Sequence, residues 1–464
     1  MIDELPSTDN TNKNILETIN MSQENDVESN TSRFFHQNLY ENDIHIFDLI
    51  VNSYNTKNSQ KMLVNLHKFN QISLNINFPY FVKFRESGLS KILLELINNE
   101  CNINTLSLIL KIITNLTSYP EEDRYIHDLI NNSMFTILLH LIETRHTENI
   151  ISDIFRIFSN CCLTNIEIRD VFLNSIPINI LTDCKMIDIA GMKKVLKLLR
   201  AIIHFQISED ILNIIIDFLS SSCVSGDINN GINSQILYPL IDFVYEMKKN
   251  YSFNHKMLDS NIINGLISSF PHVKDYKKTT VLLEIFVPMI KIIPERFLGL
   301  IPTLLNNLNS KYSEVSLGSA IAIRLLLIDN INLFNTDDLQ NFIASFINIF
   351  PKTKNKAQII LCGIICEITM NLPKEFTHQV AHSLLEIYND MIDLDSSYLS
   401  RNILNSIVDI QMKEDQCENG EEILQLFISE NMSTITSFLY SDDEKLSEIT
   451  ELFLSVFSER NEKD

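Results

Sequence analysis

Apolar residues recur every three or four positions along most of this chain, from about residue 34 to about residue 457. This spacing is the period of an amphipathic α-helix, in which positions three and four apart share one face. Short breaks rich in Asn, Ser, Pro or Gly separate the apolar segments roughly every 20 or 40 residues. Because the chain has only 9 Gly and 11 Pro among 464 residues, we expect long helices joined by short turns.

One part of the pattern repeats at a nearly constant interval. Residues 89–124 align with residues 134–169, about 45 positions later, and a weaker third copy follows after about 44 more. Besides the apolar frame, two polar positions recur on the same predicted helix: Lys111 aligns with Arg156, and Asn115 with Asn160. A helical unit of this length is too small to bury its own apolar face, so the units must stack on one another.

The predicted helices fall into repeated groups. One early group has three helices, at residues 121–131, 134–143 and 149–163. Later groups contain two helices each, for example 297–307 with 313–328, and 339–350 with 357–370. Up to residue 457 we count about nine or ten such groups. The sequence therefore predicts an all-α protein that forms a right-handed α-solenoid.

The formal net charge of −22 is concentrated at the two ends of the chain. Residues 1–32 contain seven acidic residues and one Lys, and residues 411–464 contain fourteen acidic and four basic residues. We expect a disordered acidic tail at 1–32, three-helix repeats at 33–206, degenerate helical repeats at 207–457 and a disordered acidic end at 458–464. The Ser-, Gly- and Asn-rich run at 220–231 is expected to be a loop or a hinge. Acidic ends repel nucleic acid and anionic lipid, which disfavours both as partners.

Specific residues give the repeat a family resemblance. A Gly-Leu pair at Gly88 opens the second predicted helix, and an Asn follows near the end of the third, as Asn115 and Asn160. This arrangement resembles armadillo repeats over residues 88–175 and extends to 206, whereas the rest resembles armadillo or HEAT repeats only generically. In importin-α-like armadillo proteins, the third helices line a concave groove whose Asn side chains bind the backbone of an extended peptide. The resemblance implies such a ladder here, with His204 in the next position.

The position one turn before each Asn differs from that family. Importin-α-like repeats carry a Trp there, which holds the stem of a ligand Lys, but this chain contains no Trp. Basic residues occupy this position and its surroundings instead, namely Lys111, Arg156, Lys193, Lys197 and Arg200. If the third helices are concave, these residues and His204 form a basic groove. The matching partner is an extended acidic or phosphorylated segment of another protein.

The same residues also fit three alternative roles. A Lys and Arg stripe is usually a solvated helix face. The two Asn side chains are as well suited to capping, or to packing the third helix against the next repeat, as to binding a ligand. The acidic segment from Asp3 to Glu28 of this chain is itself a candidate occupant of the groove. An importin-α-like nuclear transport adaptor is the alternative function, although basic residues in place of Trp disfavour a basic cargo signal.

Signatures of enzymes and metal sites are weak. There is no Gly-rich phosphate loop, nucleophile elbow or paired-Cys zinc spacing. His378 and His382 are one helical turn apart, but Gln379 stands where a zinc protease has Glu. Cys362 and Cys366 lie in an apolar run and are expected to pack in the core. We therefore expect a non-catalytic interaction scaffold with no catalytic residue, metal, cofactor or small-molecule substrate.

The expected location is the cytoplasm, the nucleus or both. The eight Cys residues show no disulfide framework spacing, which is typical of a reducing compartment. The first 32 residues show no cationic or apolar signal segment. Apolar runs are far shorter than the roughly 18 residues needed to span a bilayer, so membrane insertion is not expected.

Overall fold

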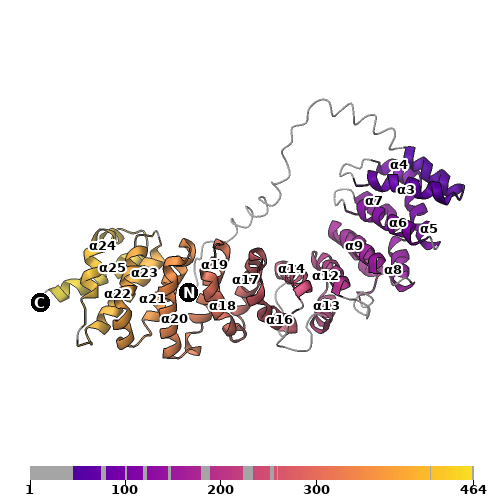
Figure 1. Ribbon diagram of the computed structural model, residues 1–464. Helices are drawn as coiled ribbons and strands as arrows, with labels where there is room; N and C mark the ends of the chain where they lie inside the picture. The colour runs from indigo at the N-terminus through magenta and orange to yellow at the C-terminus, as the bar shows by residue number, and fades with distance from the viewer. Residues whose placement is uncertain are drawn as a thin grey trace, which may run out of the picture. The chain divides into compact units, whose positions relative to one another are not determined.

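The chain is known from a computed structural model (Figure 1). It divides into two compact units, Met1–Thr164 (unit 1) and Asn165–Asp464 (unit 2). Within the described residues, no helix has both the length and the apolar character needed to cross a bilayer. The structure describes residues 45–74, 80–99, 102–118, 123–144, 148–178, 189–222, 232, 234–250, 255–258, 260–394, 396–418 and 420–461. The predicted tail at 1–32 and most of the predicted loop at 220–231 lie outside these ranges.

Unit 1 is built of stacked helices. After a first helix at residues 45–55 come α3 (Ser59–Ile72), α4 (Phe81–Glu86), α5 (Leu89–Asn98), α6 (Ile103–Leu116), α7 (Asp123–Asn131), α8 (Met134–Thr144) and α9 (Glu148–Thr164). α6 packs between α3 and α9, α5 packs on α8, and α4 packs on α7. Two successive three-helix repeats, α4–α6 and α7–α9, therefore lie side by side as the sequence predicted.

Local sequence explains where these helices begin. Gly88 has a φ of 66°, which favours glycine, and this residue separates α4 from α5. Asn102 precedes α6, and its side chain accepts a hydrogen bond from the backbone N–H of Thr105 at 3.0 Å. The Gly-Leu signal and the Asn punctuation of the sequence thus mark real helix ends.

Unit 2 continues with mostly two-helix repeats. A continuous row of helices packs in chain order: α12 (Ile189–Ile203), α14 (Ser234–Asn250), α17 (Tyr276–Ile290), α19 (Ser313–Leu327), α21 (Asn355–Thr369), α23 (Ser397–Glu414) and α25 (Glu444–Asn461). The other helices are α10 (Ile166–Ser175), α13 (Glu209–Ser222), α15 (His255–Leu258), α16 (Asn261–Ser269), α18 (Ile301–Leu308), α20 (Thr336–Ile349), α22 (Lys374–Met391) and α24 (Ile423–Phe438). Short 3-10 turns include η2 (Phe270–His272), η3 (Pro294–Leu300), η4 (Ile331–Leu333) and η5 (Phe350–Lys352).

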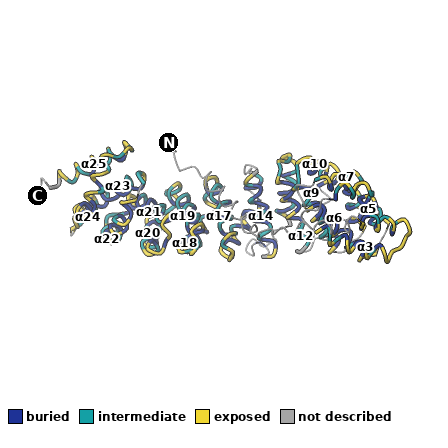
Figure 2. The backbone as a smooth tube through the Cα atoms, turned by 90° about the horizontal axis from the view of Figure 1, so that it is seen from above, coloured by how far each residue is buried: buried dark blue, intermediate teal, exposed yellow. Residues whose placement is uncertain are grey.

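We call α3, α6 and α9 of unit 1, and the continuous row of unit 2, the third-helix rows. Each member closes one repeat and packs on the corresponding helix of the next repeat within its unit. Apolar side chains fill the space between packed helices, and Figure 2 shows the buried residues there and the exposed residues on the outward faces. The fold class is therefore all-α, as predicted.

The described cysteines behave as core residues. Cys161, Cys162, Cys362 and Cys366 are buried, and Cys417 is partly buried. Burial raises the pKa of the Cys161 thiol far above its ordinary value. Burial, together with a hydrogen bond to Cys366, does the same to the pKa of the Cys362 thiol. These two thiols therefore stay protonated, which fits core packing.

Candidate peptide-binding surface

Asn115 lies in the last turn of α6 and contacts the preceding repeat. Its Nδ2 donates to Asn70 Oδ1 at 3.2 Å and to Ser73 Oγ at 3.0 Å. Asn70 lies in α3, and Ser73 follows the last residue of that helix. The amide therefore joins the ends of two neighbouring third helices.

Asn160 repeats this contact one step along the row. Its Nδ2 lies 3.3 Å from the carbonyl oxygen of Thr114, 3.3 Å from Thr117 Oγ1 and 3.1 Å from Ser118 Oγ, all near the end of α6. Both Asn side chains are partly buried. Their N–H groups are thus used inside the protein, and within the described residues no hydrogen bond is made by either Oδ1 atom. Each of these two side chains can therefore offer a peptide ligand only its oxygen, as a hydrogen-bond acceptor.

Lys111 and Arg156 stand four residues before these two Asn residues. Both side chains are exposed, and neither has an acidic partner among the residues that the structure describes. The contacts of Asn160 with the end of α6 show that α6 and α9 run parallel and in matching register. Lys111 and Arg156 therefore occupy equivalent positions on one face of two packed helices.

The remaining predicted residues lie in unit 2, on α12 or, in the case of His204, directly after it, and most of them already have partners. Lys193 Nζ donates to Gln235 Oε1 at 3.3 Å. Arg200 Nη2 lies 3.4 Å from Glu246 Oε2, and His204 Nδ1 lies 2.8 Å from Glu246 Oε1. Lys197 is exposed and has no acidic partner among the described residues. The basic residues predicted for one groove thus belong to two units. Of the four in unit 2, Arg200 and His204 face a carboxylate of the protein itself.

Glu246 was missed by the sequence reasoning. Its side chain is only 6% exposed, and it lies in α14, the next helix of the row. The sequence does contain a signal for this residue, namely its spacing. Glu246 follows His204 by 42 residues, and the same separation joins Asn115 to Ser73 and Asn160 to Ser118. A polar residue about one repeat away is therefore the first partner to consider for any polar residue on these rows.

Acid–base pairs of this kind continue along unit 2. Each joins neighbouring helices of the third-helix row or the turn before the next one. The pairs are Asp242 with Lys278, Lys248 with Glu284 (3.8 Å), Arg324 with Glu367 (3.9 Å) and Arg401 with Asp443 (3.8 Å). Burial and the nearby Glu284 carboxylate raise the pKa of Tyr245 to about 12, so this phenol stays neutral beside them. Much of the charge on this row is therefore neutralised internally.

The two histidines weighed as a metal pair each face a carboxylate. His378 Nδ1 lies 2.8 Å from Glu414 Oε2, and His382 pairs with Glu421. The Glu414 side chain is 0% exposed, and its Oε2 also accepts the backbone N–H of Glu421 at 3.0 Å. Within the described residues, no three His, Cys, Asp or Glu side chains come together as a metal-binding group. These contacts hold α22 to the end of α23.

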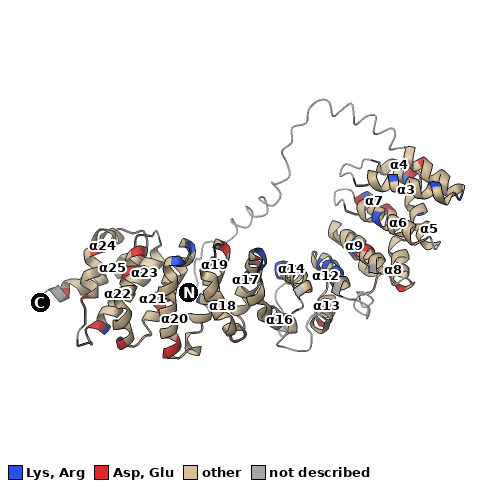
Figure 3. Ribbon diagram, viewed as in Figure 1, with Lys and Arg blue, Asp and Glu red and all other residues tan. Residues whose placement is uncertain are grey.

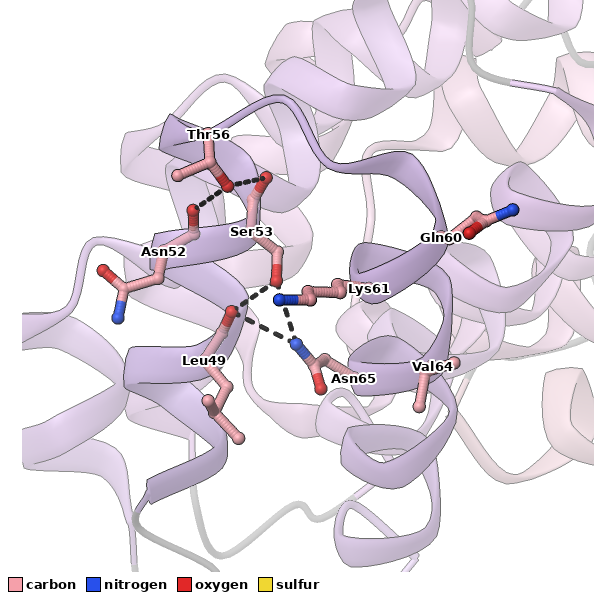
Figure 4. A pocket seen from close by; sticks show the side chains of 8 residues that line it. All are labelled: Leu49, Asn52, Ser53, Thr56, Gln60, Lys61, Val64 and Asn65. Atoms are coloured by element: carbon pink, nitrogen blue, oxygen red, sulfur yellow. Dashed lines mark hydrogen bonds between the residues drawn. The ribbon is translucent and has the colours of Figure 1, made fainter.

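An open cleft of about 580 Å³ lies at the start of unit 1 (Figure 4). Asn65 Nδ2 crosses its wall to the carbonyl oxygen of Leu49 at 3.2 Å and to Ser53 Oγ at 3.0 Å. Its lining combines apolar surface, including Leu49 and Val64, with amides, hydroxyls and one amine, and no His, Cys or acidic residue is among the lining residues. Its lining residues are Leu49, Asn52, Ser53, Thr56, Gln60, Lys61, Val64 and Asn65.

These observations define an all-α helical-repeat protein with stacked three-helix repeats in unit 1. No protein-family model and no curated protein matches its sequence. An engineered protein of known crystal structure has a similar fold, with a TM-score of 0.58 and 12% identity over 89% of this chain and 98% of that chain. A designed armadillo repeat protein in complex with the peptide (KR)4 gives a TM-score of 0.34 and 16% identity, over 60% of this chain and 98% of that chain. The engineered protein supports the fold alone.

One prediction follows directly from the contacts of the Asn residues. Asn160→Ala removes donors to three acceptors near the end of α6, so we expect the free energy of unfolding to fall by about 1–3 kcal/mol. Lys111→Ala removes only an exposed side chain and is expected to change it by less than about 0.5 kcal/mol. Urea unfolding followed by circular dichroism measures both variants. Equal stabilities of the two would show that the Asn contacts contribute nothing to repeat packing.

Proposed function

We propose that unit 1 binds an extended acidic or phosphorylated segment of another protein along the face shared by α6 and α9. The observation that carries this proposal is the pair Lys111 and Arg156, two exposed cations without acidic partners at equivalent positions of packed parallel helices in the described part of the chain. In contrast, Arg200 and His204 of unit 2 face Glu246. In this proposal the protein is a non-catalytic scaffold or adaptor.

Each repeat of this face offers the ligand a cation and an amide oxygen. The cation pairs with a carboxylate or a phosphate, and Oδ1 of Asn115 or Asn160 accepts an N–H of the ligand backbone. The N–H groups of both Asn residues are used between repeats, so the ladder makes one backbone hydrogen bond per repeat rather than two. Contact with the backbone oxygen of the ligand therefore has to come from elsewhere.

The magnitudes indicate weak binding of short ligands. An exposed ion pair contributes roughly 0.2–1 kcal/mol and a hydrogen bond roughly 0.5–1.5 kcal/mol. Two of each supply about 1–5 kcal/mol, below the roughly 8 kcal/mol of a micromolar complex. We therefore expect a short acidic peptide to bind with a Kd weaker than micromolar, and longer partners to use further contacts.

Charge reversal of the two cations tests this function. Binding of a fluorescent peptide of eight Glu residues, and of one containing four phosphoserines, is measured by fluorescence polarisation with the full chain. The variant Lys111→Glu/Arg156→Glu is expected to weaken binding about tenfold or more, because two attractive contacts become repulsive. The matched control is Arg85→Glu/Lys91→Glu, which changes the net charge equally at exposed positions of α4 and α5. If both variants lose affinity equally, the loss reflects the net charge of the protein, and the proposed role of Lys111 and Arg156 is wrong.

A further inference from the structure

Lysines gather around the starts of three consecutive helices of the third-helix row in unit 2. The loop before α17 and its first turn contain Lys274 and Lys277, and Lys311 precedes α19. Around the start of α21 lie Lys352, Lys354 and Lys356. All six side chains are exposed. We call these six residues the lysine edge.

Contacts between the three helices place these lysines on one edge of unit 2. Tyr276 and Tyr312 stack with ring centroids 3.8 Å apart, which joins the starts of α17 and α19. Arg324, near the end of α19, lies 3.9 Å from Glu367, near the end of α21. Helices that meet at their ends in this way run parallel, so their starts also lie at a common edge. In Figure 3, blue ribbon, the colour of both Lys and Arg, appears along the upper side of this region.

Acidic residues do not neutralise this edge. Lys278 is not counted with it because it pairs with Asp242. Asp275 uses its carboxylate to cap α17, where it accepts the backbone N–H groups of Lys277 and Lys278. Glu314, in the first turn of α19, is a further acid at this edge. Six exposed cations thus lie here beside Asp275 and Glu314, in a protein whose net charge is −22.

The lysines also occupy positions that helix stability disfavours. The positive end of a helix dipole favours Asp or Glu near the helix start, yet α21 has no acid in its first turn and α17 has only its N-cap, Asp275. In the same row α19 and α25 have Glu314 and Glu444 in the first turn, whereas α12, α14 and α23 have no acid there. The loops before α17 and α21 are built alike, since each has a Phe-Pro 3-10 turn, at Phe270 and Phe350, followed by lysines. Exposed lysines thus recur in two loops of similar structure on this edge.

We propose that the lysine edge is a second docking surface, which binds an acidic segment of a partner protein. Packed helices lie about 8–10 Å apart, so the edge spans about 20 Å, the length of about six extended residues. The mobile Lys side chains suit carboxylates placed at variable spacing. The surface is separate from the face of α6 and α9, and it does not depend on the function proposed for that face.

A nucleic acid fits this surface less well. Arg, which pairs with phosphates and bases in a bidentate geometry, is missing from the six residues. Tyr276 and Tyr312 stack on each other, so their facing surfaces are not open to bases. The net charge of −22 also repels a long polyanion more strongly than a short acidic peptide.

The first experiment compares three charge reversals on the edge with three elsewhere in unit 2. The full-length edge variant is Lys274→Glu/Lys354→Glu/Lys356→Glu, and the control variant is Lys249→Glu/Lys291→Glu/Lys445→Glu, at exposed positions outside the six residues of the edge. Both variants also carry Lys111→Glu/Arg156→Glu, so that the face of α6 and α9 does not bind the probe. The probes are a fluorescent peptide of ten Glu residues and a ten-nucleotide single-stranded DNA. We expect at least a tenfold weaker Kd for the peptide with the edge variant and little change with the control. Equal Kd values for the two variants, or tighter binding of the DNA than of the peptide, would overturn the proposal.

Cross-linking then locates the bound peptide. A carbodiimide joins peptide carboxylates to nearby Lys amines with loss of water, and mass spectrometry identifies the modified residues. We expect cross-links at Lys274, Lys311 and Lys354, and we expect them to persist in Lys111→Glu/Arg156→Glu. Cross-links confined to Lys111 would overturn the lysine edge while supporting the face of unit 1. The edge variant is expected to fold, because Glu near a helix start is expected to raise thermal stability slightly. A loss of binding is therefore not caused by misfolding.

Discussion

Replacing Arg169 with methionine is expected to lower the free energy of unfolding of unit 2 by about 3–5 kcal/mol. Arg169 lies in α10, and its side chain is only 2% exposed. The guanidinium donates to the carbonyl oxygens of Ile202 at 3.3 Å, Phe205 at 3.0 Å and Gln206 at 3.0 Å. These carbonyls lie at and beyond the end of α12, where helical C=O groups lack partners within their own helix. One buried side chain thus caps the end of the next helix in the repeat.

The size of the expected effect comes from what the substitution leaves behind. Methionine fills similar space but donates no hydrogen bond, so the carbonyls at the end of α12 become unsatisfied, at roughly 1–3 kcal/mol for a buried group. The favourable position of a cation at the negative end of the α12 dipole is lost as well. Lysine keeps the charge but not the planar fork of donors, so Arg169→Lys is expected to give an intermediate loss.

Urea unfolding followed by circular dichroism measures these changes, and hydrogen exchange shows whether the last turn of α12 opens first. The matched control is Arg156→Met, because Arg156 is exposed and has no acidic partner among the described residues. It is expected to change stability by less than about 0.5 kcal/mol. A loss of under 1 kcal/mol for Arg169→Met would mean that water satisfies the α12 carbonyls equally well.

Arg169 also shows how far the sequence pattern reaches. The repeat alignment places it opposite Arg124. In the structure Arg124 lies 5.1 Å from the centroid of the Phe81 ring, whereas Arg169 is buried against carbonyls. The periodicity predicted that both positions recur. It could not predict their roles, because burial depends on the residues that the next repeat supplies.

Helix positions were more predictable than contacts between repeats. The helix expected at 134–143 is observed at Met134–Thr144, because its apolar period and flanking breaks are local features. The helix expected at 297–307 is instead a 3-10 turn, Pro294–Leu300, followed by α18, which has a proline near its start. Proline restricts the chain at both points and divides what periodicity alone treats as one helix.

The candidate site illustrates the same limit. The sequence identified Asn115 and Asn160 as equivalent but left open whether they bind a ligand or pack repeats together. The hydrogen bonds to Ser73 and Ser118 show packing contacts for their N–H groups, and the ligand contact of their oxygens stays a prediction. Since Ser73 and Ser118 are themselves one repeat apart, the same alignment contained the information. It becomes useful only once the ends of neighbouring third helices are known to touch.

Arg200→Glu is expected to destabilise unit 2 by about 1–2 kcal/mol, whereas Arg156→Glu is expected to change stability by less than about 0.5 kcal/mol. The sequence treats both residues as members of one basic groove. In the structure Arg200 lies 3.4 Å from the carboxylate of Glu246, a side chain that is 6% exposed, and Arg156 has no such neighbour among the described residues. A carboxylate at position 200 would replace this attraction by repulsion from Glu246, and because the Arg200 side chain is 47% exposed, water screens part of that repulsion. Loss of peptide binding by an Arg200→Glu variant would therefore not identify a ligand contact.

A compensating substitution at Glu246 distinguishes two possible roles of Arg200, namely contact with Glu246 and contact with the ligand. Arg200→Glu/Glu246→Gln removes the like-charge contact, because a neutral amide replaces the buried carboxylate and can hydrogen-bond to both His204 and the new Glu. This double variant is expected to recover at least half of the lost stability in urea unfolding. If the recovered protein also recovers binding of the peptide of eight Glu residues, Arg200 acts only through Glu246 and α14. If stability returns and binding does not, Arg200 contacts the acidic ligand itself, and α12 of unit 2 then also binds acidic segments.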